Sequence, residues 1–432
     1  MLALAGALLA CGPTASLPPQ AIPSPNSVPV TGVGEGSSTS GGAPPARTAA
    51  PPTPDWPPQR SERIAGWVGQ VSAQRLFEHI QTLAAIPSRH VNSATIGQAA
   101  EYIHHQFEVA GGRLIVSRDE FPLVWDSIPT AQVNVVATLP GSDPDAGMVV
   151  IGAHYDSRTI DLADATSPAP GANDNATGVA AVLEIARVLA HQTPRATVIF
   201  AAFSAEEVGR QGSLHYVEAG RALGEDSWRA MLALDIVGNA AGPAGEGAIR
   251  VFSADPPDSP SRQLARFAAL VGEQYVPGFD AQVQAALDRP GRYSDHLSFS
   301  EDGVAAVRLI EPLEDPSRQH SPLDTPEHVS ATYVQHAAQL ALAILASIAW
   351  GPDAPNAPVI VGDRLEWSPV EGAVAYAVAV RAGDSLEYQD TFYTIQPWIN
   401  RALLAGWDVA SVAAIGPDGS MSAFSPERML RP

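Results

Sequence analysis

The middle of the chain alternates between short apolar runs and amphipathic stretches. The apolar runs are rich in β-branched residues and cover 132–139, 148–153, 196–203, 231–234 and 305–310. Nearly continuous hydrophobicity over about four to eight residues predicts strands that are buried on both faces. These runs are therefore expected to form the interior strands of a sheet.

Between these runs, apolar residues recur three or four positions apart, which is the spacing of one helix face. The predicted helices lie at 96–107, 179–190, 264–270 and 329–350. The alternation predicts a three-layer α/β/α sandwich with a mostly parallel central sheet. Ligands bind such sheets beyond the carboxyl ends of the strands, so the polar residues that follow each strand are the first candidates for a site.

Beyond residue 350 the pattern changes to short alternating strands. They are expected at 365–367, 374–380 and 407–415. Residues 356–432 resemble a fibronectin type III domain in their early Trp367, the strand around Tyr376 and the run 412–420 before a last strand. The resemblance implies a small β-sandwich whose aromatic residues form its core, and it identifies no partner for this module.

The N-terminus differs from the rest of the chain. Residues 1–11 form an apolar run that ends at Cys11 and is too short to span a bilayer, which predicts a signal segment. The run resembles the lipobox of bacterial lipoproteins without its basic start. It implies export to the bacterial cell envelope and a lipidated Cys11 as a membrane anchor, or, alternatively, an ordinary cleaved signal and secretion. Residues 12–58 contain thirteen prolines among small residues and are predicted to be a disordered linker to the α/β domain at 59–350.

Composition narrows the possible chemistry. The chain has 25 basic residues, all arginine, and 46 acidic ones, for a net charge of −21. This balance argues against nucleic acid as a partner, and the lack of lysine excludes a Walker-type phosphate site and a pyridoxal Schiff base. With Cys11 as the single cysteine, a metal ion would have to be bound by His, Asp and Glu.

Such residues follow the predicted strands. The candidates are His154, Asp156, Glu206, Glu207 and Asp235 directly after three of the runs, Asp174 before the helix at 179–190, and the pairs Asp295-His296 and His320/Asp324 further on. Each cluster alone is weak evidence, because a lone His-x-Asp is commonly a surface or core pair. Together they supply enough ligands for two divalent ions and an unligated carboxylate to act as a base.

The clusters resemble the co-catalytic dizinc aminopeptidase family, which includes bacterial leucyl aminopeptidases, glutamate carboxypeptidases and, more distantly, glutaminyl cyclases. The similarity covers about residues 60–350 and rests on four motifs in order. These are Ala-His-Tyr-Asp-Ser at 153–157, Gly-Ala-Asn-Asp-Asn-Ala-Thr-Gly at 171–178, Ser-Ala-Glu-Glu-Val-Gly at 204–209 with Gly-Ser at 212–213, and His-Ser-Pro-Leu-Asp-Thr at 320–325. The resemblance implies a zinc-exopeptidase fold and two Zn²⁺ ions.

The resemblance also implies a role for each residue. The metal ligands would be His154, Asp174 as the bridge, Glu207, Asp235 and His320. Glu206 would be the general base, and Asp156 would orient His154. Tyr293, Asp295 and His296 would lie near the substrate or the oxyanion, although Tyr293 does not align with the tyrosine of the family, so the oxyanion donor stays open.

The function expected from this resemblance is that of an aminopeptidase that releases N-terminal residues from peptide substrates. A glutamate carboxypeptidase-like activity is an alternative and would need a cationic pocket, for which Arg210, Arg289, Arg292 and Arg308 are candidates. A glutaminyl cyclase-like activity and a non-catalytic binding protein on the same fold are further alternatives. No recognisable pattern specifies the side-chain preference or the oligomeric state.

Overall fold

A computed structural model describes residues 60–224 and 227–431 of the chain. The predicted signal segment 1–11 with Cys11 and the predicted linker 12–58 lie outside the described residues.

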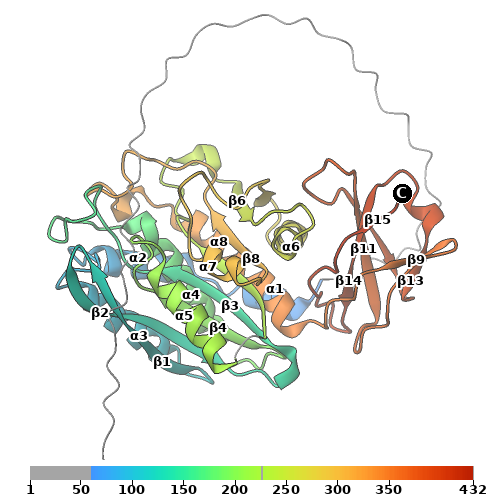
Figure 1. Ribbon diagram of the computed structural model, residues 1–432, viewed down its shortest axis with the longest axis horizontal. Coiled ribbons are helices and arrows are strands. Elements are labelled where there is room, and N and C mark those ends of the chain that lie inside the picture. The colour runs from blue at the N-terminus through green and yellow to red at the C-terminus, as the bar shows by residue number, and fades with distance from the viewer. Residues whose placement is uncertain (1–59, 225–226, 432) are drawn as a thin grey trace, which may run out of the picture. The chain divides into compact units, whose positions relative to one another are not determined.

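The described residues begin with three helices, alternate mostly between strands and helices in the middle, and end in a series of strands (Figure 1). The helices are α1 Glu62–Val68, α2 Ala73–Ala84, α3 Ile96–Ala110, α4 Thr177–Leu189, α5 Gln211–Leu223, α6 Pro260–Tyr275, α7 His296–Glu301 and α8 Ala331–Trp350. The strands of the first sheet are β1 Ile115–Trp125, β2 Ile128–Leu139, β3 Met148–His154, β4 Thr197–Phe203, β5 Trp228–Leu234, β6 Ala248–Ser253, β7 Asp280–Val283 and β8 Ala306–Ile310. Each apolar run of the sequence lies in one of these strands.

The first sheet has the order β1-β2-β4-β3-β5-β8-β6-β7. Its middle is parallel, because β3 pairs in parallel with β4 and β5, and β5 with β8. Antiparallel pairs lie to either side, between β1, β2 and β4 and between β8 and β6. The predicted α/β fold with a mostly parallel centre is confirmed.

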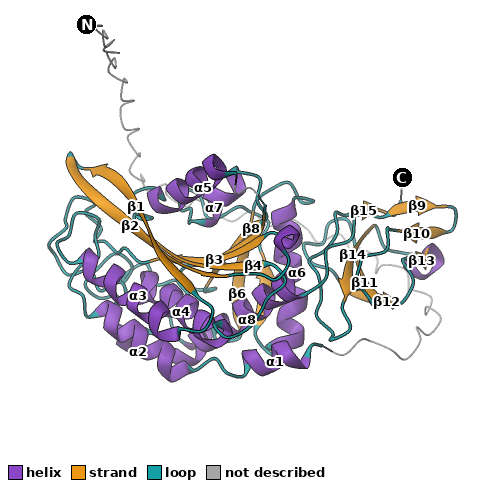
Figure 2. Ribbon diagram, turned by 90° about the horizontal axis from the view of Figure 1, so that it is seen from below, coloured by secondary structure: helices purple, strands orange, loops and turns teal. Residues whose placement is uncertain are grey.

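Helices cover both faces of this sheet (Figure 2). Successive residues of a strand point to opposite faces. Val149 and Ile151 of β3 belong to the large core with α4 and α8, whereas Val150 between them packs in a second cluster with Phe299 of α7. The two clusters are the two interfaces of a three-layer sandwich.

Helix α8 is the one helix of the described residues that is long and apolar enough to cross a membrane. Of its most apolar window, 72% is buried inside the protein. It contacts α1, α2, α4 and α6. Its hydrophobicity is that of a central helix of the core.

The C-terminal strands form two antiparallel sheets. They are β9 Val359–Val361, β10 Arg364–Glu366, β11 Ala375–Arg381, β12 Asp390–Thr394, β13 Trp398–Asn400, β14 Val409–Ile415 and β15 Arg428–Met429, in the orders β13-β10-β9 and β12-β11-β14-β15. Tyr376 and Val378 of β11 pack on Trp367 in a core of this segment, whereas Ala377 and Ala379 join the large α/β core. The segment therefore has a core of its own and also shares the core of the first sheet.

Candidate metal and catalytic site

Three neighbouring strands end at the same edge of the sheet, and the candidate residues follow them. His154 is the last residue of β3 and pairs in register with Phe203, the last residue of β4. Glu206 and Glu207 come shortly after β4, and Asp235 directly follows β5. Because these strands run parallel, their carboxyl ends bring residues that are far apart in sequence to one place.

Asp174 reaches this place from the turn before α4. The turn lies against the end of β5, where the Asn175 side chain donates to the Leu234 carbonyl at 2.9 Å. Gly178 lies so close to the same carbonyl that a Cβ there would collide with it. Only glycine allows this close approach, which places Asp174 beside Asp235.

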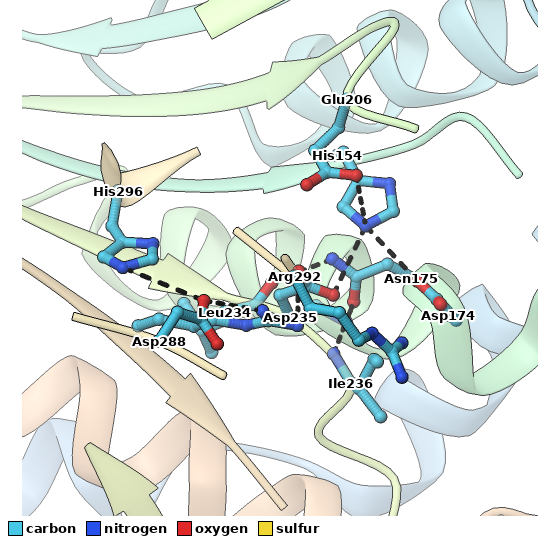
Figure 3. Close-up of polar contacts among 12 residues, drawn as sticks. His154, Asp174, Asn175, Glu206, Leu234, Asp235, Ile236, Asp288, Arg292 and His296 are labelled. Atoms are coloured by element: carbon cyan, nitrogen blue, oxygen red, sulfur yellow. Dashed lines mark hydrogen bonds and ion pairs between the residues drawn. The ribbon is translucent and has the colours of Figure 1, made fainter. Parts of the chain in front are cut away.

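The first group of candidate ligands consists of His154, Asp174 and Asp235. His154 Nε2 lies 3.3 Å from Asp174 Oδ1 and 3.3 Å from Asp235 Oδ1, and all three side chains are buried. Figure 3 shows the imidazole of His154 facing both carboxylates. One nitrogen and two carboxylate oxygens converge, and they could hold a metal ion.

The second group consists of Asp174, Glu207 and His320. His320 Nε2 lies 3.2 Å from Asp174 Oδ2 and 3.3 Å from Glu207 Oε1. Asp174 is common to both groups and turns one carboxylate oxygen toward each. This arrangement suits a carboxylate that bridges two ions.

The charges of these groups fit divalent cations. Burial lowers the pKa of His154, but the carboxylates of Asp235 and Glu206 outweigh burial and raise this pKa well above its ordinary value. Burial raises the pKa of Asp174, yet hydrogen bonds from His154 and His320 lower it well below its ordinary value. Glu207 Oε1 is buried and lies 3.3 Å from His320 Nε2. A buried, anionic oxygen of this kind is a suitable metal ligand.

Glu206 lies beside the first group and belongs to neither. Its Oε2 atom is 3.9 Å from His154 Nε2. Burial raises the pKa of Glu206 well above its ordinary value; His154 opposes this shift, and the carboxylates of Asp235 and Glu207 add to it. A carboxylate with a raised pKa is suited to accept and return a proton.

Asp156 has two sets of contacts. His154 Nδ1 lies 3.2 Å from the backbone carbonyl of Asp156 and 3.5 Å from its Oδ1. The carboxylate accepts hydrogen bonds from the backbone N–H groups of Glu206 and Glu207, both at 3.1 Å. The first set agrees with the expected orienting role, and the second was not foreseen from the sequence.

Asp324 and Arg89 hold the backbone around the site. The Asp324 carboxylate accepts from the N–H groups of Asn173 at 2.8 Å and Asp174 at 3.0 Å. Arg89 is fully buried and donates to the carbonyls of Tyr155 at 2.6 Å and Gly171 at 2.9 Å. Arg89 thereby connects the segments that carry His154 and Asp174, and Asp324 connects the segment of Asp174 to that of His320. The sequence contains Asp324 within a motif but no local signal for Arg89.

Two further arginines contact the unshared carboxylates. Arg158 Nε lies 2.7 Å from Glu207 Oε2. Arg308 lies 2.9 Å from Asp235 Oδ2 and 2.8 Å from Asp288 Oδ2. Neither contact was expected from the sequence, where Arg308 was a candidate for binding a substrate carboxylate.

The residues expected near the substrate lie in three different surroundings. Tyr293 is 45% exposed. Asp295 is buried, and its carboxylate oxygens make no hydrogen bond within the described chain. His296 is fully buried with Nε2 2.9 Å from the Leu287 carbonyl, and Figure 3 shows its ring beside Asp288, away from His154. Burial lowers the pKa of His296 to about 4, so its imidazole is neutral at pH 7.

The fold and the site together define a metal-dependent hydrolase. The chain belongs to peptidase family M28, whose model matches residues 134–345. A probable zinc metalloprotease of the fungus Leptosphaeria maculans is 33% identical over 359 residues, which cover 72% of this chain and 83% of that protein. A probable zinc metalloprotease of Pyricularia oryzae is 32% identical, with 72% of each chain covered. The metal-dependent peptidase expected from the motifs is thereby confirmed.

Solved structures share the fold. The LapA aminopeptidase of Legionella pneumophila superposes with a TM-score of 0.56 at 22% identity, over 66% of this chain and 74% of that one. BSAP, a zinc aminopeptidase of Bacillus subtilis, gives 0.52 at 20% identity, over 63% and 94%. A glutaminyl cyclase of Bacteroides thetaiotaomicron also gives 0.52, at 19% identity over 64% and 98%. The same architecture therefore occurs with two different activities, and the choice between them depends on the site.

Proposed function

We propose that this chain is a zinc-dependent aminopeptidase that removes N-terminal residues from peptides with the help of two ions. The observation that carries the proposal is the shared carboxylate of Asp174, with one oxygen 3.3 Å from His154 Nε2 and the other 3.2 Å from His320 Nε2. A buried glutamate outside both groups, Glu206, lies beside them. The proposal is also supported by a relative that is named a probable zinc metalloprotease and by a similar structure that is named an aminopeptidase.

The proposed reaction divides between the ions and Glu206. Bound zinc would polarise the scissile carbonyl and make a water molecule more acidic. Glu206 would take a proton from the attacking water and give it to the leaving amine. The raised pKa of Glu206 suits both steps, because a carboxylate with an ordinary pKa would hold the proton too weakly.

The arginines near the site argue for recognition of the amino end. A carboxypeptidase needs a free cation for the terminal carboxylate of its substrate. Arg308 is buried between Asp235 and Asp288, Arg289 is paired with Glu314, and Arg210 contacts Ser298 and Glu301. These three guanidinium groups are thus engaged by side chains of the protein. The fourth candidate, Arg292, donates to Gln319 at 2.9 Å and keeps 38% of its side chain exposed, so the carboxypeptidase alternative depends on this residue.

A carboxylate is available for the substrate amine instead. Asp295 is buried, and its negative charge is among those that raise the pKa of Glu206. Its oxygens are buried without a hydrogen-bond partner among the described residues. We therefore assign Asp295 to the pocket that receives the N-terminal ammonium group.

The roles of Glu206 and Glu207 are separated by one experiment. Glu206→Ala should keep both ions and lower kcat by about 10²- to 10⁴-fold, because it removes a base. Glu207→Ala, the matched control, should lose metal because it removes a ligand. Metal analysis by mass spectrometry and turnover of an aminoacyl anilide measure the two effects. Unchanged turnover of Glu206→Ala would reject its role as the base.

The substrate class is tested on the full chain, stripped by a chelator and then restored with zinc. A panel of aminoacyl anilides should release free amine only after zinc is restored. A peptide that begins with glutamine separates hydrolysis from cyclisation, because hydrolysis adds water and cyclisation loses ammonia, as a mass spectrum shows. Protein that binds two zinc ions but releases no amine would favour the carboxypeptidase or cyclase alternative.

Two proposals concern regions beside the catalytic part. We propose export to the cell envelope with Cys11 as a lipid anchor, on the basis of the apolar run 1–11. Incorporation of labelled fatty acid by the wild type and not by Cys11→Ser would support the anchor.

We also propose that 356–432 is a fibronectin type III-like module, in accordance with its two antiparallel sheets.

A further inference from the structure

Each group has one unshared carboxylate, and an arginine contacts the outer oxygen of that carboxylate. Asp235 turns Oδ1 toward His154 Nε2 at 3.3 Å and Oδ2 toward Arg308 at 2.9 Å. Glu207 turns Oε1 toward His320 Nε2 at 3.3 Å and Oε2 toward Arg158 at 2.7 Å. In both groups one oxygen faces the other candidate ligands, and a guanidinium group engages the second.

Both guanidinium groups are themselves held in place. Arg308 is 3% exposed and bonds Asp288 Oδ2 at 2.8 Å from its other terminal nitrogen. Arg158 also donates to the Thr159 carbonyl at 3.1 Å. Separating a buried arginine from a buried carboxylate leaves both charges unpaired, which is strongly unfavourable. The Arg308 pair is buried and the Arg158 pair is partly buried, so both guanidinium groups engage the outer oxygens of Asp235 and Glu207.

We propose that Arg158 and Arg308 restrict the two unshared carboxylates to one metal-facing oxygen each, and that this restriction selects zinc over larger, oxygen-preferring cations. The inference rests on the proposed zinc site. With the restriction, each group offers three protein donors: one imidazole nitrogen, one oxygen of Asp174 and one further oxygen. Three protein ligands and an open position are typical of catalytic zinc.

Calcium has the opposite requirement. It takes six to eight oxygen ligands and often binds a carboxylate through both oxygens. An arginine on the second oxygen of Asp235 or Glu207 removes this donor and also lowers the negative charge that a cation meets. Loss of this oxygen donor weakens zinc binding less than calcium binding, because zinc binds imidazole well and needs fewer ligands.

The experiment measures metal selectivity in the full chain. Wild type, Arg158→Met and Arg308→Met are stripped of metal, and the dissociation constants of zinc and calcium are determined by competition dialysis. The ratio of the calcium to the zinc constant should fall by about tenfold or more in each variant. In Arg158→Lys and Arg308→Lys, which retain the charge, this ratio should fall less. Ratios within about twofold of the wild type in folded Met variants would overturn the inference.

A matched control separates this effect from a general loss of charge. Arg187 bonds both oxygens of the buried Glu184, at 2.7 and 2.8 Å, in a pair that contains no candidate ligand. Arg187→Met should leave the ratio unchanged, and an equally large shift there would contradict the proposal. If Arg308→Met fails to fold, Arg308→Met/Asp288→Asn removes the uncompensated carboxylate, and Arg158→Met tests the second group independently.

The visible spectrum of cobalt(II) gives a second readout that needs no catalysis. Four-coordinate cobalt absorbs more strongly than six-coordinate cobalt, so the Met variants should show weaker absorption as a second oxygen becomes available. Failure of the proposed function has a different signature. Wild-type protein that binds no zinc would reject the zinc site itself, whereas wild type that binds zinc with unaltered ratios in the variants would reject only this inference.

Discussion

The two ligand groups share Asp174, but the chain holds them in different ways. In the first group, His154 ends β3 and Asp235 follows β5, and they are 1% and 3% exposed. In the second group, Glu207 and His320 lie on loops, and the side chain of His320 is 17% exposed with a left-handed backbone φ of +53°. The same ligand chemistry is thus built once on a rigid sheet edge and once on loops.

This difference leads to a specific expectation about metal binding. Groups on a sheet edge keep their geometry without the ion, whereas loop residues lose conformational entropy when they bind it. The first group should therefore bind its ion more tightly than the second. The predictions below test this comparison, from the largest expected effect to the smallest.

Asp174→Ala should have the largest effect, because it removes the carboxylate that both groups use. We expect loss of both ions and a fall in activity of more than about 10³-fold. Metal analysis after dialysis measures the first result and anilide hydrolysis the second. Asp280→Ala, at an exposed position, is the control. Two ions retained by Asp174→Ala would refute the shared role of this carboxylate.

His154→Ala and His320→Ala should lower the free energy of unfolding of the metal-free protein by different amounts. His154 is buried among the carboxylates of Asp174, Asp235 and Glu206, and its loss removes the buried positive charge that lies between them, at about 3–5 kcal/mol. His320 is partly exposed, so water screens its charge, and its loss should cost less, at most about 3 kcal/mol. Urea denaturation of the chelated proteins measures both free energies of unfolding. Equal costs would remove the distinction between the two groups.

The metal-free protein should lose stability at alkaline pH through His320. Burial lowers the pKa of His320, but Glu207 and Asp174 outweigh it and raise this pKa to about 9. The unfolded chain holds the proton more weakly, with a pKa near 6.5, so the contribution is complete below about 6.5 and is lost as the pH rises through about 9. The loss should amount to about 3 kcal/mol at most. Urea midpoints of the chelated wild type and His320→Ala between pH 6 and 10 test it, and parallel curves would contradict it.

Asp324→Ala should have the smallest effect, and it should act on both groups. The variant removes the acceptor of the Asn173 and Asp174 N–H groups and leaves every candidate ligand in place. Loss of such supporting contacts typically weakens metal binding by about 10- to 100-fold. Asp324→Asn keeps one acceptor oxygen and should lose less. Zinc titration of both variants gives the affinities, and an unchanged affinity in Asp324→Ala would show that Asp174 needs no such support.

The sequence allowed the central strands and the clusters after them to be predicted, because both signals are local. Runs such as 148–153 are apolar enough to indicate burial, and polar residues follow them directly. Strand β1 gave no such signal. It is an edge strand with Pro122 and several charged, exposed positions, so it lacks a buried run. The short strands β6 and β7 were not predicted either, because the polar residues Arg250 and Gln282 interrupt their apolar runs.

The supporting contacts of the site could not be predicted, because they join distant parts of the chain. Arg308 meets Asp235 across 73 positions, and Asp156 meets the N–H group of Glu206 across 50. A pattern of neighbouring residues contains no information about such pairs. The resemblance to a known family indicated the candidate ligands but not the arginines, since these lie outside the quoted motifs or at their margins.

The carboxylate of Asp156 has a consequence for protein engineering. It accepts from two successive backbone N–H groups, those of Glu206 and Glu207, while the backbone carbonyl of the same residue lies beside His154. The proposed base and one proposed ligand are therefore fixed to the same anchor. A site transplanted into another scaffold would need Asp156 together with the loops after β3 and β4. Without these contacts, nothing would fix the proposed base and ligands relative to one another.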